Sequence, residues 1–383
     1  MAGVYFHIPF CKQACHYCDF HFSTSLKYKQ EMLQAIAHEL KLQADFLPTN
    51  QINTVYFGGG TPSLLTAKEI DFLIHELAQY YNITSDAEIT LEANPDDLDK
   101  EKISSLTHTD INRLSIGVQS FYDEDLRWMN RAHCAQEAET AIKRAQDTGF
   151  ANITADLIYG FPMLTDEKWA NNVNKLAHFQ IPHISAYNLT VEPRTALAHF
   201  IAKGKQATPD EEQGARQFTW LIERLVEEGY QHYEISNFAK PNRYAIHNTN
   251  YWQAIPYLGL GPSAHSYNGL NRQWNVNHNT KYIRAIMENT LPAEVETLSI
   301  TDRLNEYIMT SLRTMWGLSL SYVQSTFGFT IYQNLLKQVR PFIAKQYIQE
   351  TEEHLILTTQ GKLMADHIAA TLFADKEGIY EED

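Results

Sequence analysis

Three of the four cysteines of the chain lie close together, at Cys11, Cys15 and Cys18, with the spacing C-x3-C-x2-C. Thiolates are the ligands that iron–sulfur clusters and zinc prefer. A [4Fe–4S] cluster held only by protein normally takes four cysteines, and the fourth, Cys134, lies far away in the sequence. Three close thiolates would therefore hold three corners of a cluster and leave one iron open to a small-molecule ligand.

A zinc site is the alternative that this spacing leaves open. Zinc binds Cys3His sets, and a nearby histidine could complete one: His7, His16 or His21. Disulfides are not expected in a reducing compartment, so we interpret the three cysteines as metal-binding.

The elements that must position these cysteines are predicted by alternating short apolar runs and longer amphipathic stretches. The apolar runs predict strands at Val4–Ile8, Val55–Gly58, Glu88–Glu92, Arg113–Val118, Ile153–Ile158 and His183–Leu189. Helical patterns lie between them at Tyr28–Phe46, Ala67–Tyr81, Ala135–Gly149 and Glu167–Phe179. Such alternation predicts an α/β fold with parallel strands and right-handed crossovers. Periodicity alone fits a partial barrel or a doubly wound sheet.

In a barrel, residues that follow the strands meet at one mouth. The cysteine loop follows the first predicted strand, Gly58–Ser63 the second, and Glu92–Pro95 the third. Gln119 follows the fourth strand, and Asp156 lies near the end of the fifth. We therefore expect one site to contain all of these residues.

Several longer motifs make the sequence similar to a known family. The cysteine spacing after a first strand resembles the radical S-adenosylmethionine (SAM) superfamily. The motifs HIPFC, YFGGGTPSLL, LEANP, RLSIGVQSF, NRAHCAQEA and DLIYGFP resemble the coproporphyrinogen dehydrogenase/HemW family over nearly the whole chain. The resemblance implies a radical SAM partial (β/α)6 barrel whose open iron is chelated by the amino and carboxylate groups of SAM.

The resemblance also implies roles for individual residues. Gly59, Gly60 and Thr61 would face the methionine moiety; alone, they would be read as a tight turn, for which glycine is the default residue. Glu92 would pair with the methionine amino group and Arg131 with its carboxylate, a task that suits the guanidinium fork. Gln119 and Asp156 would bind the ribose hydroxyls or nearby groups, and Tyr5 and Tyr17 would flank the cluster and the adenine. Cys134 is assigned no role.

Two functions occur in this family. One is oxygen-independent coproporphyrinogen III oxidation (dehydrogenase) to protoporphyrinogen IX, and the other is a HemW-type haem chaperone that binds haem and delivers it to client haemoproteins. The dehydrogenases read C-x3-C-x2-C-x-C, whereas this chain has Phe20 at the last position. That difference favours the chaperone, and whether the chain is also an enzyme that cleaves SAM stays open. A third hypothesis makes the barrel a relic and the C-terminal part a protein-docking module.

The segment His247-Asn-Thr-Asn-Tyr-Trp252 matches the H-N-x-x-Y-W motif of HemW-type proteins. A neutral imidazole can ligate haem iron, and Tyr251 and Trp252 offer flat apolar faces to a porphyrin. The alternative is a core histidine that hydrogen-bonds among packed aromatic residues. His247 is the first candidate for haem contact, and His265, in Gly-Pro-Ser-Ala-His, is the second.

Charge and hydropathy limit the possible partners. The formal net charge of −15 and the lack of a basic run argue against nucleic acid. No apolar stretch approaches the roughly 20 residues that span a bilayer, and the N-terminus lacks the pattern of a signal peptide. We expect a cytoplasmic protein that binds haem and client haemoproteins. If the clients are membrane-bound respiratory enzymes, the protein would reach the membrane only peripherally, through its client.

Three regions are predicted along the chain. Residues 1–208 form the barrel with the cluster and SAM site, and residues 209–295 extend it with a segment rich in His, Asn and aromatic residues. Residues 296–383 form a mainly helical, winged-helix-like module with a strand pair near Tyr347–Thr358.

Overall fold

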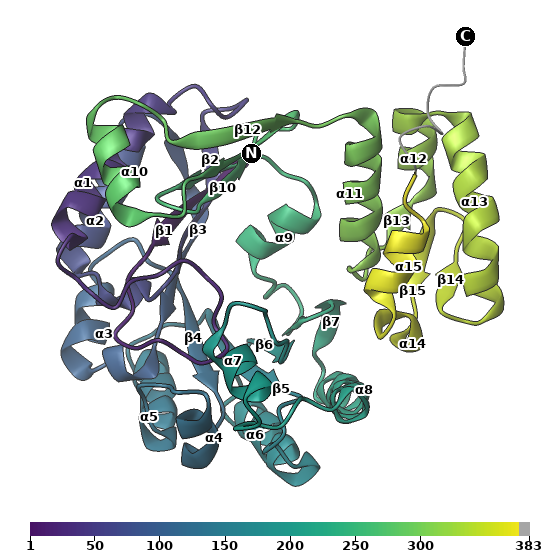
Figure 1. Cartoon of the computed structure of the whole chain (residues 1–383), viewed down its shortest axis with the longest axis horizontal. Helices are drawn as coiled ribbons and strands as arrows, with labels where there is room; N and C mark the ends of the chain where they lie inside the picture. Colours follow the sequence, from purple (N-terminus) through teal and green to yellow (C-terminus); the bar gives the residue numbers. More distant parts are fainter. Residues whose placement is uncertain (375–383) are drawn as a thin grey trace.

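The computed structural model describes residues 1–374. Six parallel strands lie side by side in chain order and form the partial barrel (Figure 1). Their bounds are β1 (Ala2–Ile8), β2 (Gln51–Gly59), β3 (Asn82–Ala93), β4 (Arg113–Gln119), β5 (Ile153–Tyr159) and β6 (His183–Asn188). The predicted α/β class is confirmed. Because the six strands are neighbours in chain order, the fold is the partial barrel and not the doubly wound sheet.

Helices connect the strands and cover the outside of the barrel (Figure 1). They are α1 (Lys29–Leu42), α2 (Ala67–Ala78), α3 (Lys100–Leu106), α4 (Asp123–Trp128), α5 (Ala135–Asp147) and α6 (Asp166–His178). The start of α2 shows why helices begin where they do. Thr66 and Glu69 form a reciprocal capping box, which satisfies amide groups that the first turn cannot pair. Between the layers, apolar side chains pack into one continuous core, as the stacked rings of Phe6 and Phe57 illustrate at 4.8 Å.

The segment after β6 extends the same sheet at both edges. After α7 (Ala196–Ala202) and α8 (Glu211–Glu227), the strands β7 (Gln231–Glu234) and β8 (Asn237–Ala239) join beside β6. The chain then returns through α9 (Ile246–Trp252) to β9 (Tyr257–Leu260), which pairs parallel with β1. The sheet ends with β10 (His265–Tyr267), β11 (Asn271–Asn275) and β12 (Ala293–Thr297), and α10 (Asn279–Met287) packs on α1.

A C-terminal unit with its own apolar core follows β12. Its helices are α11 (Ile300–Leu312), α12 (Leu320–Phe327), α13 (Phe329–Ala344), α14 (Thr359–Lys362) and α15 (Ala365–Thr371). A three-stranded sheet joins β13 (Leu318–Ser319), β15 (His354–Leu357) and β14 (Ile348–Glu350), so the predicted strand pair is confirmed. Figure 1 shows this unit beside the barrel, with α11 on the side that faces it. Residues 375–383 of the predicted third region lie outside the described part of the chain. The boundaries after residues 208 and 295 stay predictions.

Among residues 1–374, no helix is both long enough and apolar enough to span a bilayer.

Candidate functional site

A cavity of about 430 Å³ opens where β1–β6 end, and the three clustered cysteines line it. We call it the cluster cavity. Its walls also include most of the polar residues predicted from the strand ends: Tyr17, Gly59, Gly60, Thr61, Glu92, Gln119, Arg131 and Asp156. The partial barrel therefore brings these side chains from separate strands to a single mouth, as parallel strands with helical crossovers require.

The cysteine loop leaves β1 and is held by backbone hydrogen bonds. The Cys11 amide donates to the Ser23 carbonyl at 3.0 Å, and the Cys18 amide donates to the Cys15 carbonyl at 3.4 Å. All three thiols are free. Burial raises the pKa of the Cys11 thiol and raises that of Cys18 to about 12, and the neighbouring thiols add to both shifts. Three thiolates would therefore need a positive counter-charge here, which the iron–sulfide core of a cluster supplies. The donor set fits that group.

No three His, Cys, Asp or Glu side chains among residues 1–374 converge closely enough to hold a single metal ion. A zinc ion holds its sulfur and nitrogen ligands at about 2.0–2.3 Å, whereas a cubane spreads its thiolates over separate corners. The histidines proposed for the zinc alternative make other contacts: His7 Nε2 with the His21 carbonyl at 3.0 Å, and His16 Nδ1 with the Trp128 carbonyl at 2.9 Å.

The glycine turn after β2 packs directly against the loop that carries the cysteines. The amides of Gly60 and Thr61 donate to the carbonyls of Ile8 and Phe10, at 3.0 and 2.7 Å. A Cβ on Gly60 would lie 2.6 Å from the Phe10 carbonyl oxygen, so backbone fills the space of a side chain. Gly59 has a φ of +103°, which favours glycine. The turn thus positions the cluster loop as well as lining the cavity.

Arg131 links the cysteine loop to the ends of β3 and β4. Its Nη1 lies 3.5 Å from Cys15 Sγ and 3.5 Å from the Tyr17 hydroxyl, while its Nη2 donates to Asn94 Oδ1 at 2.7 Å and to the Gly117 carbonyl at 3.1 Å. Burial disfavours the charge, but Tyr17 and Cys15 leave the pKa of Arg131 raised. Arg131 therefore brings a permanent positive charge to the cavity, a suitable partner for a carboxylate.

Two carboxyl groups, of Glu92 and Asp156, also line the cluster cavity. Burial raises the pKa of Glu92 to about 7 and that of Asp156 to about 6. Glu92 accepts a hydrogen bond from the Tyr56 hydroxyl at 2.8 Å, and Asp156 accepts one from Ser115 at 3.3 Å. A ligand that brings a positive amino group or hydroxyl donors would favour the ionised carboxylates.

Gln119 ends β4 with a φ of +64°, and its buried Oε1 has no hydrogen-bond partner among the described residues. A buried acceptor without a partner is costly, so a ligand hydroxyl at this position would be stabilised.

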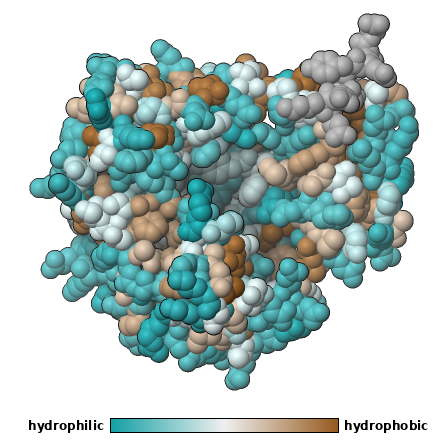
Figure 2. Space-filling model, viewed as in Figure 1, coloured by the Kyte–Doolittle hydropathy of each residue, from teal (hydrophilic) through white to brown (hydrophobic). Residues whose placement is uncertain are grey.

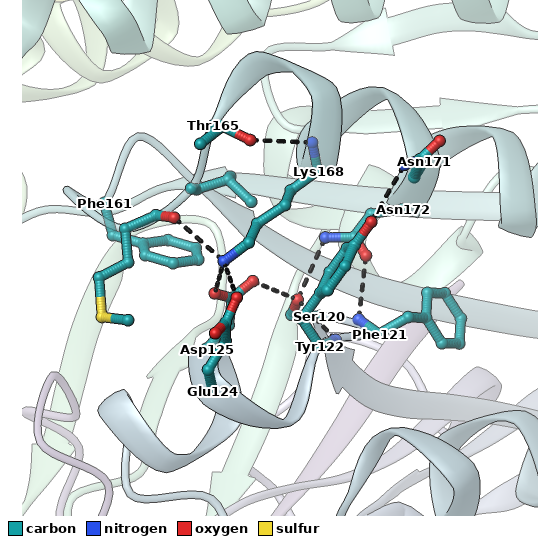
Figure 3. Close-up of polar contacts among 12 residues, drawn as sticks. Ser120, Phe121, Tyr122, Glu124, Asp125, Phe161, Thr165, Lys168, Asn171 and Asn172 are labelled. Atoms are coloured by element: carbon teal, nitrogen blue, oxygen red, sulfur yellow. Dashed lines mark hydrogen bonds and ion pairs between the residues drawn. The ribbon is translucent and has the colours of Figure 1, made fainter.

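A polar network fixes the chain directly after Gln119 (Figure 3). Ser120 donates to Asp125 Oδ2 at 2.8 Å, the Phe121 amide donates to Asn172 Oδ1 at 3.0 Å, and Lys168 contacts Asp125 Oδ1 at 3.1 Å. Asp125 is fully buried, so the network anchors the mouth of the barrel to α4 and α6.

Some residues of the site were not predicted from the sequence. Ser115, Tyr56 and Tyr187 contact predicted residues or line the cavity, whereas Asn94, which accepts from Arg131, lies in the predicted segment Glu92–Pro95. Ser115 lies within the quoted motif RLSIGVQSF, so its place on a predicted strand was a signal that could have found it. Tyr5 does not line the cluster cavity. Its ring stacks on Tyr56 at 6.0 Å and faces a neighbouring cavity.

His247 is buried and lines neither cavity, although Tyr251, which contacts its ring, lines the neighbouring one. Only 1% of its surface is exposed. Its Nδ1 lies 2.8 Å from Thr54 Oγ1, and its Nε2 lies 2.8 Å from the Tyr251 hydroxyl. Burial lowers its pKa to about 3. With both ring nitrogens engaged, His247 cannot ligate haem iron in this conformation. The structure instead shows the alternative interpretation of the motif, a core histidine that hydrogen-bonds among packed aromatic residues.

The neighbouring cavity has a volume of about 650 Å³ and lies between the barrel and the C-terminal unit. We call it the interdomain cavity. Figure 2 shows this face of the molecule hollowed near its middle, on the side of the C-terminal unit. The walls are rich in aromatic rings: Tyr5, Trp252, Tyr257, Tyr267, Tyr307, Tyr322 and Phe327. Asp19 and Phe20 line this cavity and the cluster cavity alike, so the two adjoin at the cysteine loop.

Comparisons with known proteins agree with this architecture. Residues 5–176 match the Radical SAM superfamily, and residues 298–364 match the HemN C-terminal domain. A Bacillus subtilis protein named heme chaperone HemW is 32% identical over 371 residues, which cover 96% of this chain and 98% of that protein. This chain belongs to the HemW family.

Other members of the HemW family show the same full-length similarity. HemW of Mycobacterium tuberculosis is 33% identical over 97% of this chain and 94% of its own length, and HemW of Escherichia coli is 30% identical over 97% and 98%. Among solved structures, coproporphyrinogen III oxidase (HemN) from Escherichia coli has a TM-score of 0.83 and 24% identity, covering 97% of this chain and 90% of that one. This likeness shows the shared radical SAM fold, with the HemN-type C-terminal region that the family match places after β12.

Proposed function

We propose that the chain is a haem chaperone that binds haem and delivers it to client haemoproteins. The observation that carries the proposal is the interdomain cavity, whose aromatic walls suit a flat apolar macrocycle. Its volume of about 650 Å³ falls in the range of about 300–1,000 Å³ that is usual for cofactor pockets. Full-length similarity to proteins named heme chaperone HemW supports the same conclusion.

The cluster cavity would hold a [4Fe–4S] cluster through Cys11, Cys15 and Cys18, with SAM at the open iron. Bound there, the cluster can supply an electron to the SAM sulfonium. Arg131 and Glu92 would hold the methionine carboxylate and amino group, and Gln119 and Asp156 would accept hydrogen bonds from ribose hydroxyls. Gly59, Gly60 and Thr61 would pack against the methionine moiety, and Tyr17 would flank the cluster. A cytoplasmic location and clients such as membrane-bound respiratory enzymes belong to this proposal.

The test combines haem binding with haem transfer. Ferric haem is titrated into anaerobically reconstituted protein, and the loaded protein is then mixed with an apo-haemoprotein, such as apomyoglobin, while absorbance reports where haem resides. We expect saturation at one haem per chain, followed by transfer. Failure of the wild type to bind haem saturably would refute the proposal.

The oxidase alternative is decided in a parallel sample. Reconstituted protein is supplied with coproporphyrinogen III and SAM under anaerobic conditions. The chaperone function predicts no protoporphyrinogen IX. Sustained turnover would show instead that the chain is a coproporphyrinogen dehydrogenase.

A further inference from the structure

The histidines on the wall of the interdomain cavity differ in which ring nitrogens they have free. His7 uses Nδ1 with the Tyr5 hydroxyl at 3.3 Å and Nε2 with the His21 carbonyl at 3.0 Å. His21 uses Nε2 with Asn279 Oδ1 at 2.7 Å. His265 is solvent-exposed at the start of β10, and neither of its ring nitrogens hydrogen-bonds to any described residue. Among these three, only His265 has both ring nitrogens free of hydrogen bonds to described residues, whereas His21 keeps only Nδ1 free.

The ring of His265 is oriented by its neighbour across the sheet. It pairs in register with Trp274 of β11, and the two rings lie 6.2 Å apart at an interplanar angle of 29°. Stacking on a large aromatic side chain limits the rotation of the imidazole. The ring is therefore held at the cavity wall without a hydrogen bond that would occupy a nitrogen.

Two arginines lie on the wall at the boundary between the barrel and the C-terminal unit. Arg272 of β11 pairs with Glu306 of α11 at 2.6 Å. Arg303, one turn earlier on α11, has a buried Nε without a hydrogen-bond partner in the described structure. A buried guanidinium donor without an acceptor is costly, so an anionic group that enters this cavity would be stabilised beside Arg303.

Haem has the chemistry that these observations require. Its macrocycle is flat and apolar, its iron accepts an imidazole nitrogen, and its two propionates are carboxylates that pair with arginine. We propose that haem binds in the interdomain cavity with the His265 imidazole as its iron ligand and with a propionate at Arg303. This inference rests on the proposed haem-chaperone function and adds the position of the haem and the groups that hold it.

The first experiment compares ferric haem titrations of the full chain, read by the Soret band and by electron paramagnetic resonance. The variant His265→Ala should bind haem roughly tenfold or more weakly, which corresponds to about 1.4 kcal/mol or more. Its spectrum should lose the signature of histidine ligation, and added imidazole should restore it. The matched control His178→Ala, at the exposed end of α6 on the outside of the barrel, should titrate like the wild type.

The second experiment tests the propionate contact. Arg303→Gln should weaken the binding of haem but not that of haem dimethyl ester, which lacks free carboxylates. Equal weakening for both ligands would overturn the assignment of Arg303.

The outcomes separate this inference from the proposed function. If the wild type binds haem and His265→Ala gives the same affinity and spectrum, the ligand assignment is wrong. The same conclusion follows if His21→Ala, rather than His265→Ala, changes the Soret band. Absence of haem binding by the wild type would instead refute the chaperone function itself.

Discussion

The burial of His247 gives a prediction that decides between a structural role and haem ligation. The pKa of an exposed histidine is about 6.5, and burial lowers that of His247 to about 3. The folded chain therefore keeps this ring neutral at pH values where the unfolded chain protonates it. The stability that the neutral ring contributes is fully present above about pH 6.5 and is lost as the pH falls toward about 3.

The size of this loss follows from proton linkage. Between pH 7.5 and 5.5, protonation of one unfolded histidine lowers the free energy of unfolding by about 1.4 kcal/mol if the folded state binds no proton. Other buried groups titrate in the same range, so a comparison with a variant isolates the contribution of His247. His247→Asn removes the titration while its amide can still bond to Thr54 and Tyr251. The decrease between pH 7.5 and 5.5 should be about 1.4 kcal/mol smaller in this variant.

Urea unfolding of the full chain, followed by circular dichroism at the two pH values, measures the difference. His178→Asn is the matched control, because this exposed ring has no buried partner to lose. The variant His247→Asn should also still bind haem. If the free energy of unfolding falls by the same amount between the two pH values in the wild type and in His247→Asn, the imidazole is not buried in its neutral form. If His247→Asn loses the spectrum of histidine-ligated haem, His247 is the iron ligand after all.

Three further predictions concern the cluster cavity and its supports. Cys18→Ala should abolish reconstitution of a [4Fe–4S] cluster. The control Cys134→Ala, outside the cavity at the start of α5, should reach the iron and sulfide content of the wild type. Equal iron and sulfide content in the two variants would disprove the three-cysteine site. Gly60→Ala should lower the cluster content and the melting temperature, because the new Cβ would lie 2.6 and 2.8 Å from two backbone carbonyl oxygens. Unchanged cluster content and melting temperature would show that the turn can move to accommodate the methyl group. Asp125→Ala should lower the free energy of unfolding by about 2–4 kcal/mol, because it leaves the buried Ser120 hydroxyl without its acceptor and removes the buried one of the two carboxylates that pair with Lys168. Glu124→Gln removes only the solvent-exposed carboxylate and should cost much less. Equal costs would show that burial of the network contributes nothing.

The sequence alone determined the parts of the protein that depend on local spacing. The C-x3-C-x2-C loop, the glycine turn after β2 and the polar residues at the strand ends were all predictable. Apolar periodicity identifies the strands, and parallel connectivity then places their carboxyl ends at one mouth. The same periodicity could not distinguish a barrel from an open sheet, because that choice depends on how the sheet curves and on which strand pairs with β1. In the structure the outer partner of β1 is β9, from a much later part of the chain.

Only the tertiary structure decided the state of each candidate histidine. A sequence motif identifies His247 as an imidazole next to aromatic residues, but it does not show whether the nitrogens are free. Thr54, which engages one of them, lies 193 residues away along the chain. His265 was the second candidate by sequence, yet it is the one that the fold leaves uncommitted on a cavity wall. The physical reason is that hydrogen bonds and burial arise from neighbours in space, and those neighbours come from distant segments that local patterns do not bring together.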